Sequence, residues 1–280
     1  MNYRHAFHAG NFADVLKHAV LASVIHYLQQ KPGAIRVIES HAGGGLYDLG
    51  SLAASRTSEW REGIGLLADP LDDGAEAVLA PFREALGALR AGHGPNIYPG
   101  SPLICQHMLR ADDRYIGAEL HGETNWQLKT ALNKDKRFKV LLMDGWHVLR
   151  ANVPPKERRG VVLVDPAFEA ADEWQMTARE VINAWRKWQT GCFIIWYPLK
   201  NPRQADGLTD DIVAAGVGNA LRLELIVDDL ATAEKLAGCG LIVINPPWTL
   251  RDQAEALLPA LATRLARSRK AGFRCEVIAG

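Results

Sequence analysis

The segment Gly160-Val161-Val162-Leu163-Val164-Asp165-Pro166-Ala167-Phe168 is an apolar run followed by an acid, a proline and an aromatic residue. Because the run has no polar alternation, it predicts a β-strand that is buried on both faces, as in a parallel sheet covered by helices. Ligands of open α/β sheets bind outside the carboxyl ends of the parallel strands. Asp165, Pro166 and Phe168 are therefore candidate ligand contacts. An acid at a strand end also commonly caps the next helix, so position alone leaves a structural role open.

Residues 165–168 resemble the (Asp/Asn)-Pro-Pro-(Tyr/Phe/Trp) signature of methyltransferases that act on the amino group of adenine or cytosine. Such an amine is a weak nucleophile because its lone pair is delocalised into the ring. A carboxylate and a backbone carbonyl that accept its N–H bonds would favour a tetrahedral nitrogen, and an aromatic ring would stack on the extruded base. Asp165 is thus the predicted catalytic residue, and Pro166 and Phe168 are predicted to contact the base. Ala167 replaces the second proline, which removes one φ restraint.

Composition sets broad limits on the class of protein. The chain has 280 residues, of which 48% are apolar and 23% are charged, which predicts one large globular domain or one domain with an insertion. Lys and Arg (32) balance Asp and Glu (32), so contact with nucleic acid must come from local basic patches. Candidate patches are Arg4 with His5 and Lys17, then Lys156, Arg158 and Arg159, and finally Arg264, Arg267, Arg269 and Lys270.

The cysteines at 105, 192, 239 and 275 form no Cys-x-x-Cys pair and are interpreted as reduced thiols of a cytoplasmic protein rather than as a zinc site or disulfides. The sequence shows no apolar stretch of membrane-spanning length and no signal-peptide pattern. We therefore expect a cytoplasmic protein with no membrane contact and no bound metal.

A predicted helix from Asn11, its N-cap, to about Gln30 precedes a predicted strand over 35–39. The strand runs directly into Ser40-His41-Ala42-Gly43-Gly44-Gly45. Glycines after a strand let the backbone pass close to a ligand, although glycine turns are common and this one is weak support by itself.

The next two predicted strands, over 114–120 and 138–143, also end in acids. Glu119 is interpreted as the acid of the second strand, which would accept hydrogen bonds from ribose hydroxyls; a surface acid is the alternative. Asp144, followed by Gly145, is a candidate for an adenine amino group or a plain turn.

A helical stretch from Leu52 to about Arg90 separates the first two strands and predicts an insertion. We expect residues 1–50 to begin the main domain, 51–97 to form a helical subdomain and 98–280 to complete the main domain. Ser101 is the predicted N-cap of a helix that continues through Leu109, with Pro102 at its first position.

Near the carboxyl end, predicted strands over 220–227 and 239–245 are joined by a short acidic turn, which implies antiparallel pairing. Asn245-Pro246-Pro247-Trp248 matches the methyltransferase signature more fully than residues 165–168 do. An antiparallel strand, however, would place Asn245 at the opposite edge of the sheet from Glu119 and Asp144. Asp165 is therefore preferred over Asn245 as the acceptor.

Several sequence blocks are distinctive as a set: Tyr3-Arg4-His5-x-Phe7-His8-Ala9-Gly10-Asn11, Ala13-Asp14-Val15-Leu16-Lys17-His18, His41-Ala42-Gly43-x-Gly45, Tyr98-Pro99-Gly100-Ser101-Pro102, Glu119-Leu120-His121, Asp144-Gly145, Asp165-Pro166, Trp196-Tyr197-Pro198 and Ile244-Asn245-Pro246-Pro247-Trp248. In these blocks, over nearly its whole length, the chain resembles the ribosomal RNA large subunit methyltransferase J family. The first block is long and unusual, and hence specific.

The resemblance implies an α/β fold of the class I (Rossmann-like) methyltransferase type: a seven-stranded, mainly parallel sheet with an antiparallel last strand and a small helical subdomain. It implies S-adenosyl-L-methionine bound by Lys17, His18, His41, Ser101, Glu119, Asp144, Gly145 and Asp165. It also implies substrate contacts from Tyr3 and His5.

The implied activity is methylation of the N6 amino group of an adenine in 23S rRNA, either protein-free or in an early assembly intermediate, by a monomer. Because a sulfonium methyl group is already activated, the chemistry needs alignment rather than a general base or a metal. Two alternatives stay open: a DNA adenine-N6 methyltransferase, and a non-catalytic RNA-binding protein that retains the fold.

Overall fold

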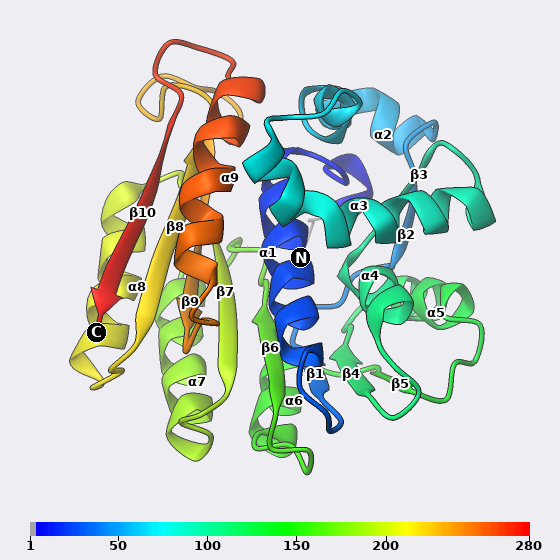
Figure 1. Cartoon of the computed structure of the whole chain (residues 1–280), viewed down its shortest axis with the longest axis vertical. Helices are drawn as coiled ribbons and strands as arrows, with labels where there is room; N and C mark the ends of the chain where they lie inside the picture. The colour runs from blue at the N-terminus through cyan, green and yellow to red at the C-terminus, as the bar shows by residue number, and fades with distance from the viewer. Residues whose placement is uncertain (1–3) are drawn as a thin grey trace.

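The computed structural model describes residues 4–280, so the predicted contact Tyr3 lies outside the described residues. An 8-stranded sheet with helices on both faces forms the body of the molecule (Figure 1). In spatial order its strands are β10 (Gly272–Ala279), β8 (Ala220–Ile226), β9 (Gly238–Ile244), β7 (Cys192–Pro198), β6 (Gly160–Val164), β1 (Arg36–Glu39), β4 (Arg114–Ala118) and β5 (Phe138–Leu141).

The parallel part of the sheet runs from β5 through β4, β1 and β6 to β7. In its register, Val37 of β1 lies beside Tyr115 of β4 and Val161 of β6. The carboxyl ends of these strands therefore share one edge of the sheet, as predicted for the ends that carry Glu119, Asp144 and Asp165.

β9 is antiparallel to both β7 and β8, which confirms the predicted hairpin. The predicted count of seven strands is wrong by one, because β10 pairs antiparallel with the outer side of β8. Many β10 side chains are exposed, so its sequence lacks the apolar run that marked the central strands. The sequence predicts a short extended segment over 273–278, but its pairing with β8 depends on a partner that a local pattern does not contain.

Alternation of side chains divides the core into two clusters, one on each face of the sheet. Val161 and Leu163 of β6 belong to one cluster, and Val162 and Val164 belong to the other. The first face is covered by α1 (Phe12–Gln29), α3 (Asp73–His93), α4 (Ser101–Met108) and α9 (Leu250–Arg264). The second is covered by α6 (Gly145–Asn152), α7 (Glu173–Lys187) and α8 (Pro202–Ala214) (Figure 1). The uninterrupted apolar run predicted this two-sided burial.

The segment predicted as a continuous helical insertion is interrupted. It contains α2 (Leu52–Thr57), two short 3₁₀ helices (Glu59–Glu62 and Ile64–Leu67) and α3, and it is flanked by the paired strands β2 (Leu46–Asp48) and β3 (Ile97–Pro99). α3 packs on α1, α4 and α9, and its Leu79 and Phe82 belong to the same hydrophobic cluster as α1. The division into domains at 51–97 stays a prediction.

The two predicted helix N-caps have different outcomes. Asn11 caps α1, because its side chain accepts hydrogen bonds from the amides of Ala13 (3.0 Å) and Asp14 (3.1 Å). The prediction for Ser101 is wrong: Gly100 is the N-cap of α4, and Ser101 is its first helical residue. The Ser101 hydroxyl donates instead to the carboxyl of Glu39. This carboxyl is buried and needs a hydrogen-bond donor, and that need outweighs capping of the helix.

The remaining global predictions concern thiols and membrane contact. Cys105, Cys192 and Cys239 are buried free thiols, as predicted, whereas Cys275 is half-buried. No helix within residues 4–280 combines the length and the apolar character needed to cross a membrane.

Asn245, which follows the antiparallel strand β9, anchors the end of that strand to a neighbouring loop. Its side-chain amide donates to the carbonyl oxygens of Gln189 (2.7 Å) and Gly191 (2.8 Å), and its φ of 49° lies in the left-handed region that asparagine tolerates. Because two backbone carbonyls lose their donor, we expect Asn245→Ala to lower the free energy of unfolding in urea by about 2 kcal/mol. Asn219→Ala, an exposed control, is expected to change it by less than about 0.5 kcal/mol. Equal stability of the two variants would contradict this anchoring role.

Candidate active site

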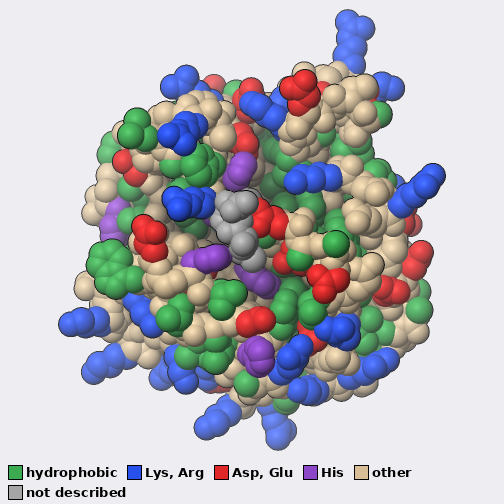
Figure 2. All heavy atoms as spheres, turned by 180° about the vertical axis from the view of Figure 1, so that it is seen from behind, with side chains coloured by type: hydrophobic (Ala, Val, Ile, Leu, Met, Phe, Trp, Pro, Cys, Tyr) green, Lys and Arg blue, Asp and Glu red, His purple; other side chains and the backbone are tan. Residues whose placement is uncertain are grey.

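The carboxyl ends of β1, β4, β5 and β6 meet at one rim of the sheet. Backbone bonds just past the strands join them: Ser40 N–H donates to Leu163 O (3.0 Å), Ala42 N–H to Ala118 O (2.8 Å) and Glu119 N–H to Leu141 O (3.0 Å). Figure 2 shows a face of the molecule on which histidine and acidic side chains gather near the centre. The rim thus brings together groups that lie far apart in the sequence.

A chain of ions, two buried and one half-buried, crosses this rim. Lys17 Nζ lies 2.6 Å from Asp165 Oδ2 and 2.9 Å from Asp14 Oδ1. Burial disfavours the ammonium form, but Asp14 and Asp165 outweigh it and raise the pKa of Lys17 well above its ordinary value. Burial would likewise raise the pKa of Asp14, yet the neighbouring His5 and Lys17 hold it well below its ordinary value. Lys17 therefore fixes the Asp165 carboxylate to α1.

Asp14 also organises the segment before α1. Its Oδ2 accepts a hydrogen bond from Gly10 N–H (2.9 Å) and lies 3.0 Å from His5 Nε2. The His5 ring meets Tyr47 edge-on, with ring centroids 5.0 Å apart. His5, predicted to contact substrate, is therefore linked to Asp165 through Asp14 and Lys17.

His18 is buried on α1 one residue beyond Lys17. Its Nδ1 lies 2.8 Å from the Tyr98 hydroxyl, while Nε2 is buried and has no hydrogen-bond partner among the described residues. Burial lowers the pKa of His18 to about 3, so the ring is neutral at physiological pH. An orphaned buried nitrogen of this kind is a position where a ligand atom satisfies an otherwise costly group.

The glycine bend after β1 presents bare backbone to the rim. Gly43 and Gly45 have φ values of 65° and 78°, a region that favours glycine. Gly43 N–H donates to Glu119 Oε2 (3.1 Å), and Glu119 Oε1 accepts from His121 N–H (2.8 Å). Each Glu119 oxygen has a second lone pair left for a hydroxyl donor. The predicted convergence of Glu119 and the glycine bend is thus present in the structure.

Asp144 and His41 both contact the first turn of α6. Asp144 caps this helix, because its Oδ1 accepts from Trp146 N–H (2.7 Å). A Cβ on Gly145 would lie 1.9 Å from Ser40 O, so the helix start abuts the end of β1. The His41 ring packs edge-on against Trp146 with centroids 5.0 Å apart, and burial lowers the pKa of His41 to about 4.

The loop after β6 holds its aromatic residue in an uncommon conformation. Phe168 has a φ of 53°, and its ring centroid lies 4.4 Å from Trp174 and 6.0 Å from Trp196. Pro166 is buried and Phe168 is half-buried. Stacking of Phe168 on a base stays a prediction.

Sequence reasoning missed two buried acids and their partners. Glu39, the last residue of β1, accepts from the hydroxyls of Ser101 and Tyr115, the latter at 2.5 Å. Burial raises the pKa of Glu39 to about 8, against the effect of these hydrogen bonds. Its place at the end of a strand, directly before the glycine bend, is a signal of the same kind as the positions of Glu119, Asp144 and Asp165. Asp14 gave no such signal, because an acid in the first turn of a helix is ordinary.

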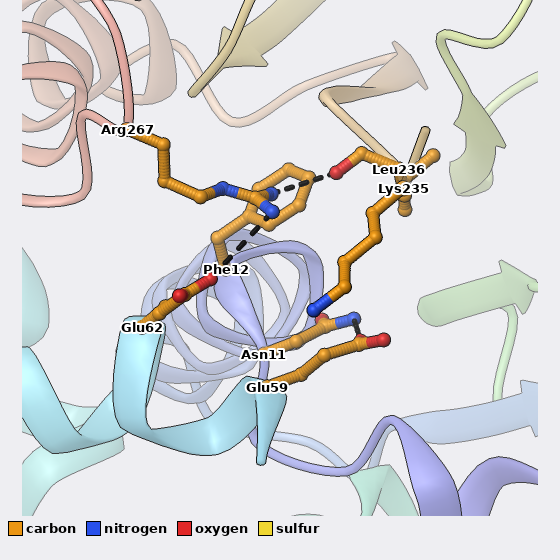
Figure 3. Close-up of a pocket in the computed structure, with 7 residues that line it drawn as sticks. All are labelled: Asn11, Phe12, Glu59, Glu62, Lys235, Leu236 and Arg267. Carbon is orange, nitrogen blue, oxygen red and sulfur yellow. Dashed lines mark hydrogen bonds and ion pairs between the residues drawn. The ribbon is translucent and has the colours of Figure 1, made fainter. Parts of the chain in front are cut away.

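A small cavity of about 10 Å³ lies at the start of α1, and none of the acids of the rim lines it. Figure 3 shows Arg267 reaching both Glu62 and the carbonyl oxygen of Leu236, with Asn11 bonded to Glu59 on the opposite wall. It has room for about one water and serves as a junction between segments rather than as a ligand site. Among the described residues, no group of three or more His, Cys, Asp or Glu side chains is arranged to hold a metal ion.

The strand order, the glycine bend and the acids at the ends of β4, β5 and β6 define a class I methyltransferase. A family profile described as "Ribosomal RNA large subunit methyltransferase D, RlmJ" matches residues 32–278. The chain belongs to this family.

Two curated relatives are both called ribosomal RNA large subunit methyltransferase J. The protein of Escherichia coli K12 is 36% identical over 265 residues, and that of Haemophilus influenzae Rd is 35% identical over 266 residues. Each match covers 95% of this chain and 94% of the relative. A crystal structure of a protein from Legionella pneumophila has a TM-score of 0.87 and 30% identity, and the match covers 96% of this chain and 98% of that one.

S-adenosylmethionine is the methyl donor of this class, and features of the rim fit it. The glycine bend lets a ligand approach the backbone closely, and Glu119 can still accept hydrogen bonds from ribose hydroxyls. His18 Nε2 has no hydrogen-bond partner among the described residues. Leu120, Leu142 and Met143, which flank Glu119 and Asp144, are exposed, as expected for the walls of an adenine slot. Which of the predicted cofactor residues make contact stays a prediction. Lys17 already forms ion pairs with two carboxylates, and the Ser101 hydroxyl already donates to Glu39.

Glu39 makes a prediction about stability and pH. Its folded pKa of about 8 exceeds the unfolded value of 4.5, so the folded state binds the extra proton between these values and loses stability as pH rises through them. Glu39→Gln removes this proton uptake. As pH rises from 5 to 8, we expect the unfolding free energy of the variant minus that of the wild type to increase by up to about 1.4 kcal/mol per pH unit. Urea titrations at several pH values measure this.

The control for this prediction is Glu123→Gln on α5 (Gly122–Ala131), which replaces an exposed glutamate and should follow the wild-type pH profile. Parallel profiles for Glu39→Gln and the wild type would show that Glu39 is not protonated in the folded protein.

Proposed function

We propose that this chain transfers a methyl group from S-adenosylmethionine to the N6 amino group of an adenine in 23S rRNA, acting as a cytoplasmic monomer on RNA that is free of protein or early in assembly. The observation that carries the proposal is the position of Asp165. It follows β6 at the rim that also holds the glycine bend and Glu119, and Lys17 fixes its carboxylate. Membership of a ribosomal RNA methyltransferase family supports the substrate class.

Asp165 can polarise the amine with one carboxylate oxygen. Lys17 engages Oδ2, whereas Oδ1 makes no hydrogen bond within residues 4–280. An N–H of the adenine amine would donate to Oδ1 and another to a backbone carbonyl of the following loop, which directs the nitrogen lone pair out of the ring plane. S-adenosylmethionine, when bound, supplies a methyl group on a positive sulfur that needs no acid to leave. The amine proton is lost after transfer, so no side chain is assigned as a base.

Orientation is the main contribution of this site. Lys17 and Asp14 remove the rotational freedom of the Asp165 side chain before substrate binds, so that this cost is met during folding. The half-buried Phe168 and Trp196 next to Asp165 form an apolar wall suited to an extruded base. The carboxylate, the cofactor rim and the aromatic wall together support methylation of an amino group on a flat heterocycle.

Replacement of Asp165 tests the mechanism. Asp165→Ala removes the acceptor, so kcat for N6 methylation should fall by at least about a hundredfold. N6-methyladenine is mapped by mass spectrometry in 23S rRNA from cells that carry each variant, and kcat is measured on purified rRNA. Asn245→Ala is the control, because Asn245 lies at the opposite edge and should retain full methylation once refolded protein is confirmed by circular dichroism. Methylation that survives Asp165→Ala and disappears with Asn245→Ala would reverse the choice of acceptor.

The alternative substrate is DNA, because the same cofactor rim and acceptor would serve an adenine in either polymer. We expect methyl incorporation into deproteinised 23S rRNA and little into single-stranded DNA of matched sequence at equal concentration. Wild-type incorporation into DNA alone would favour the DNA methyltransferase. Failure to bind S-adenosylmethionine in calorimetry would favour a non-catalytic RNA-binding protein.

A further inference from the structure

A groove of about 370 Å³ is lined by residues of β5 and of the segment before it. β5 is the edge strand of the sheet at the end farthest from β10 (Figure 1). The volume of the groove falls in the range of small-ligand pockets, which begins at roughly 300 Å³. The residues that line it are Lys129, Leu132, Lys134, Asp135, Phe138, Lys139 and Val140. None of them belongs to the catalytic rim.

The groove is strongly basic although the whole chain has no net charge. Residues 129–139 contain Lys129, Lys134, Lys136, Arg137 and Lys139, with Asp135 as the only acid. The four lysines are exposed, and none forms an ion pair within 4.0 Å in the part of the chain that the structure describes. A local excess of positive charge on a neutral protein is the electrostatic footprint expected of a polyanion site.

The single acid of this segment, Asp135, lines the groove but is paired with Arg137 rather than with a lysine. Asp135 forms an ion pair with Arg137 at 2.6 Å and accepts from Gln106 Nε2 at 3.2 Å. These contacts lower the pKa of Asp135 to about 2, first through its hydrogen bonds with Arg137. Arg137 also donates to the carbonyl oxygen of Gln106 at 3.0 Å. The loop is therefore anchored to α4 by its own acid, which leaves the lysines uncompensated.

Aromatic and apolar groups accompany the charge. Phe138, Leu132 and Val140 supply the apolar part of the groove lining. Trp126, 67% exposed on α5, lies three residues before Lys129 and so on the same side of the helix. Basic grooves with exposed aromatic rings are typical of proteins that bind single-stranded nucleic acid, because the rings stack on bases while the cations follow the phosphates.

α5 connects the groove to the catalytic rim. Near its amino end, the Thr124 methyl group would lie 3.6 Å from a Cβ on Gly44 of the glycine bend. Its last turns supply Lys129 to the groove, about 7.5 Å further along a helix that rises roughly 1.5 Å per residue. Trp126 lies between the two. A strand leaving the rim along α5 would thus meet the aromatic ring first and the lysines next.

Two of the three candidate basic patches drawn from the sequence are less available for RNA. Lys156, Arg158 and Arg159 precede β6 and, like the lysines that precede β5, lie at the edge of the sheet opposite Asp165. The Arg159 guanidinium, however, already donates to the backbone carbonyls of Leu28 and Pro32. Arg264 and Arg267 are likewise bonded to backbone carbonyls of neighbouring segments.

We propose that the β5 groove, with Trp126, is a second RNA-binding site that holds nucleotides flanking the target adenine. The lysines contact phosphates and Trp126 stacks on a base. This inference rests on the proposed function, because it assumes an RNA substrate whose target base enters the rim. The rival role for the lysines is protection of the exposed edge of β5 against pairing with a second copy of the chain.

The test compares two triple variants with the same change in charge. Lys129→Gln/Lys134→Gln/Lys139→Gln alters the groove, and Lys31→Gln/Lys187→Gln/Lys235→Gln alters exposed lysines elsewhere. Fluorescence anisotropy with a single-stranded fragment of 23S rRNA is measured over a series of salt concentrations. For the groove variant we expect affinity to fall at least about tenfold and the slope of log K against log salt to shrink by about 2, since three phosphate contacts are lost. The control variant should match the wild type.

Trp126→Ala provides an independent measurement. It should weaken RNA binding about tenfold with an unchanged salt slope, because stacking does not release counterions. Calorimetry with S-adenosylmethionine and thermal unfolding should be unchanged for every variant, and the loss should appear in KM for rRNA rather than in kcat.

If the groove variant has the same RNA affinity, salt slope and KM as the wild type, the second site is overturned. The proposed function is unaffected by that result as long as the wild type methylates rRNA. Self-association of the groove variant on size exclusion, with unchanged RNA affinity, would also overturn the second site and assign the lysines to edge protection. Absence of rRNA methylation by the wild type would instead refute the proposed function.

Discussion

The ion triad of Asp14, Lys17 and Asp165 is the interaction on which the site depends. The buried charges of Asp14 and Lys17 and the half-buried charge of Asp165 are costly to desolvate, and they are tolerated because each has a close partner of opposite sign. Removing one partner would leave an uncompensated charge beneath the rim. The triad therefore couples the first helix to the strand end that carries the acceptor. It also couples both to the segment before α1, because Asp14 accepts from Gly10 and faces His5.

Much of the fold was predictable because burial leaves a local pattern. Four consecutive apolar residues in β6 indicated a strand covered on both faces, and alternate side chains do enter opposite clusters. The short connection between β8 and β9 indicated antiparallel pairing, and that inference alone separated Asp165 from the better-matching Asn245. A parallel sheet then forces the ends of β4, β5 and β6 to one rim, so the meeting of Glu119, Asp144 and Asp165 follows from topology.

What could not be predicted depends on contacts between distant segments. Lys17 and Asp165 are 148 residues apart, and nothing in either local pattern specifies that one neutralises the other. Ser101 stands where an N-cap is expected, but Glu39 is buried beneath it and needs a donor more than the helix end does. In each case a buried ionisable group, whose partners are defined only once the chain is folded, determined which local preference prevailed.

The same reasoning bears on Ala167, which stands where the signature has a second proline. Proline would restrain φ at one position, and the loop here has other restraints. Phe168 is held at a φ of 53° by packing against Trp174, and the Glu173 carboxylate accepts from the amides of Glu169 (2.7 Å) and Ala170 (3.4 Å). Both restraints come from the first turn of α7, so the helix fixes the loop from its far end. Lys17 fixes the near end of the loop at Asp165. Only two residues, Pro166 and Ala167, then lie between the fixed positions Asp165 and Phe168. Under these constraints alanine loses little order that proline would have supplied.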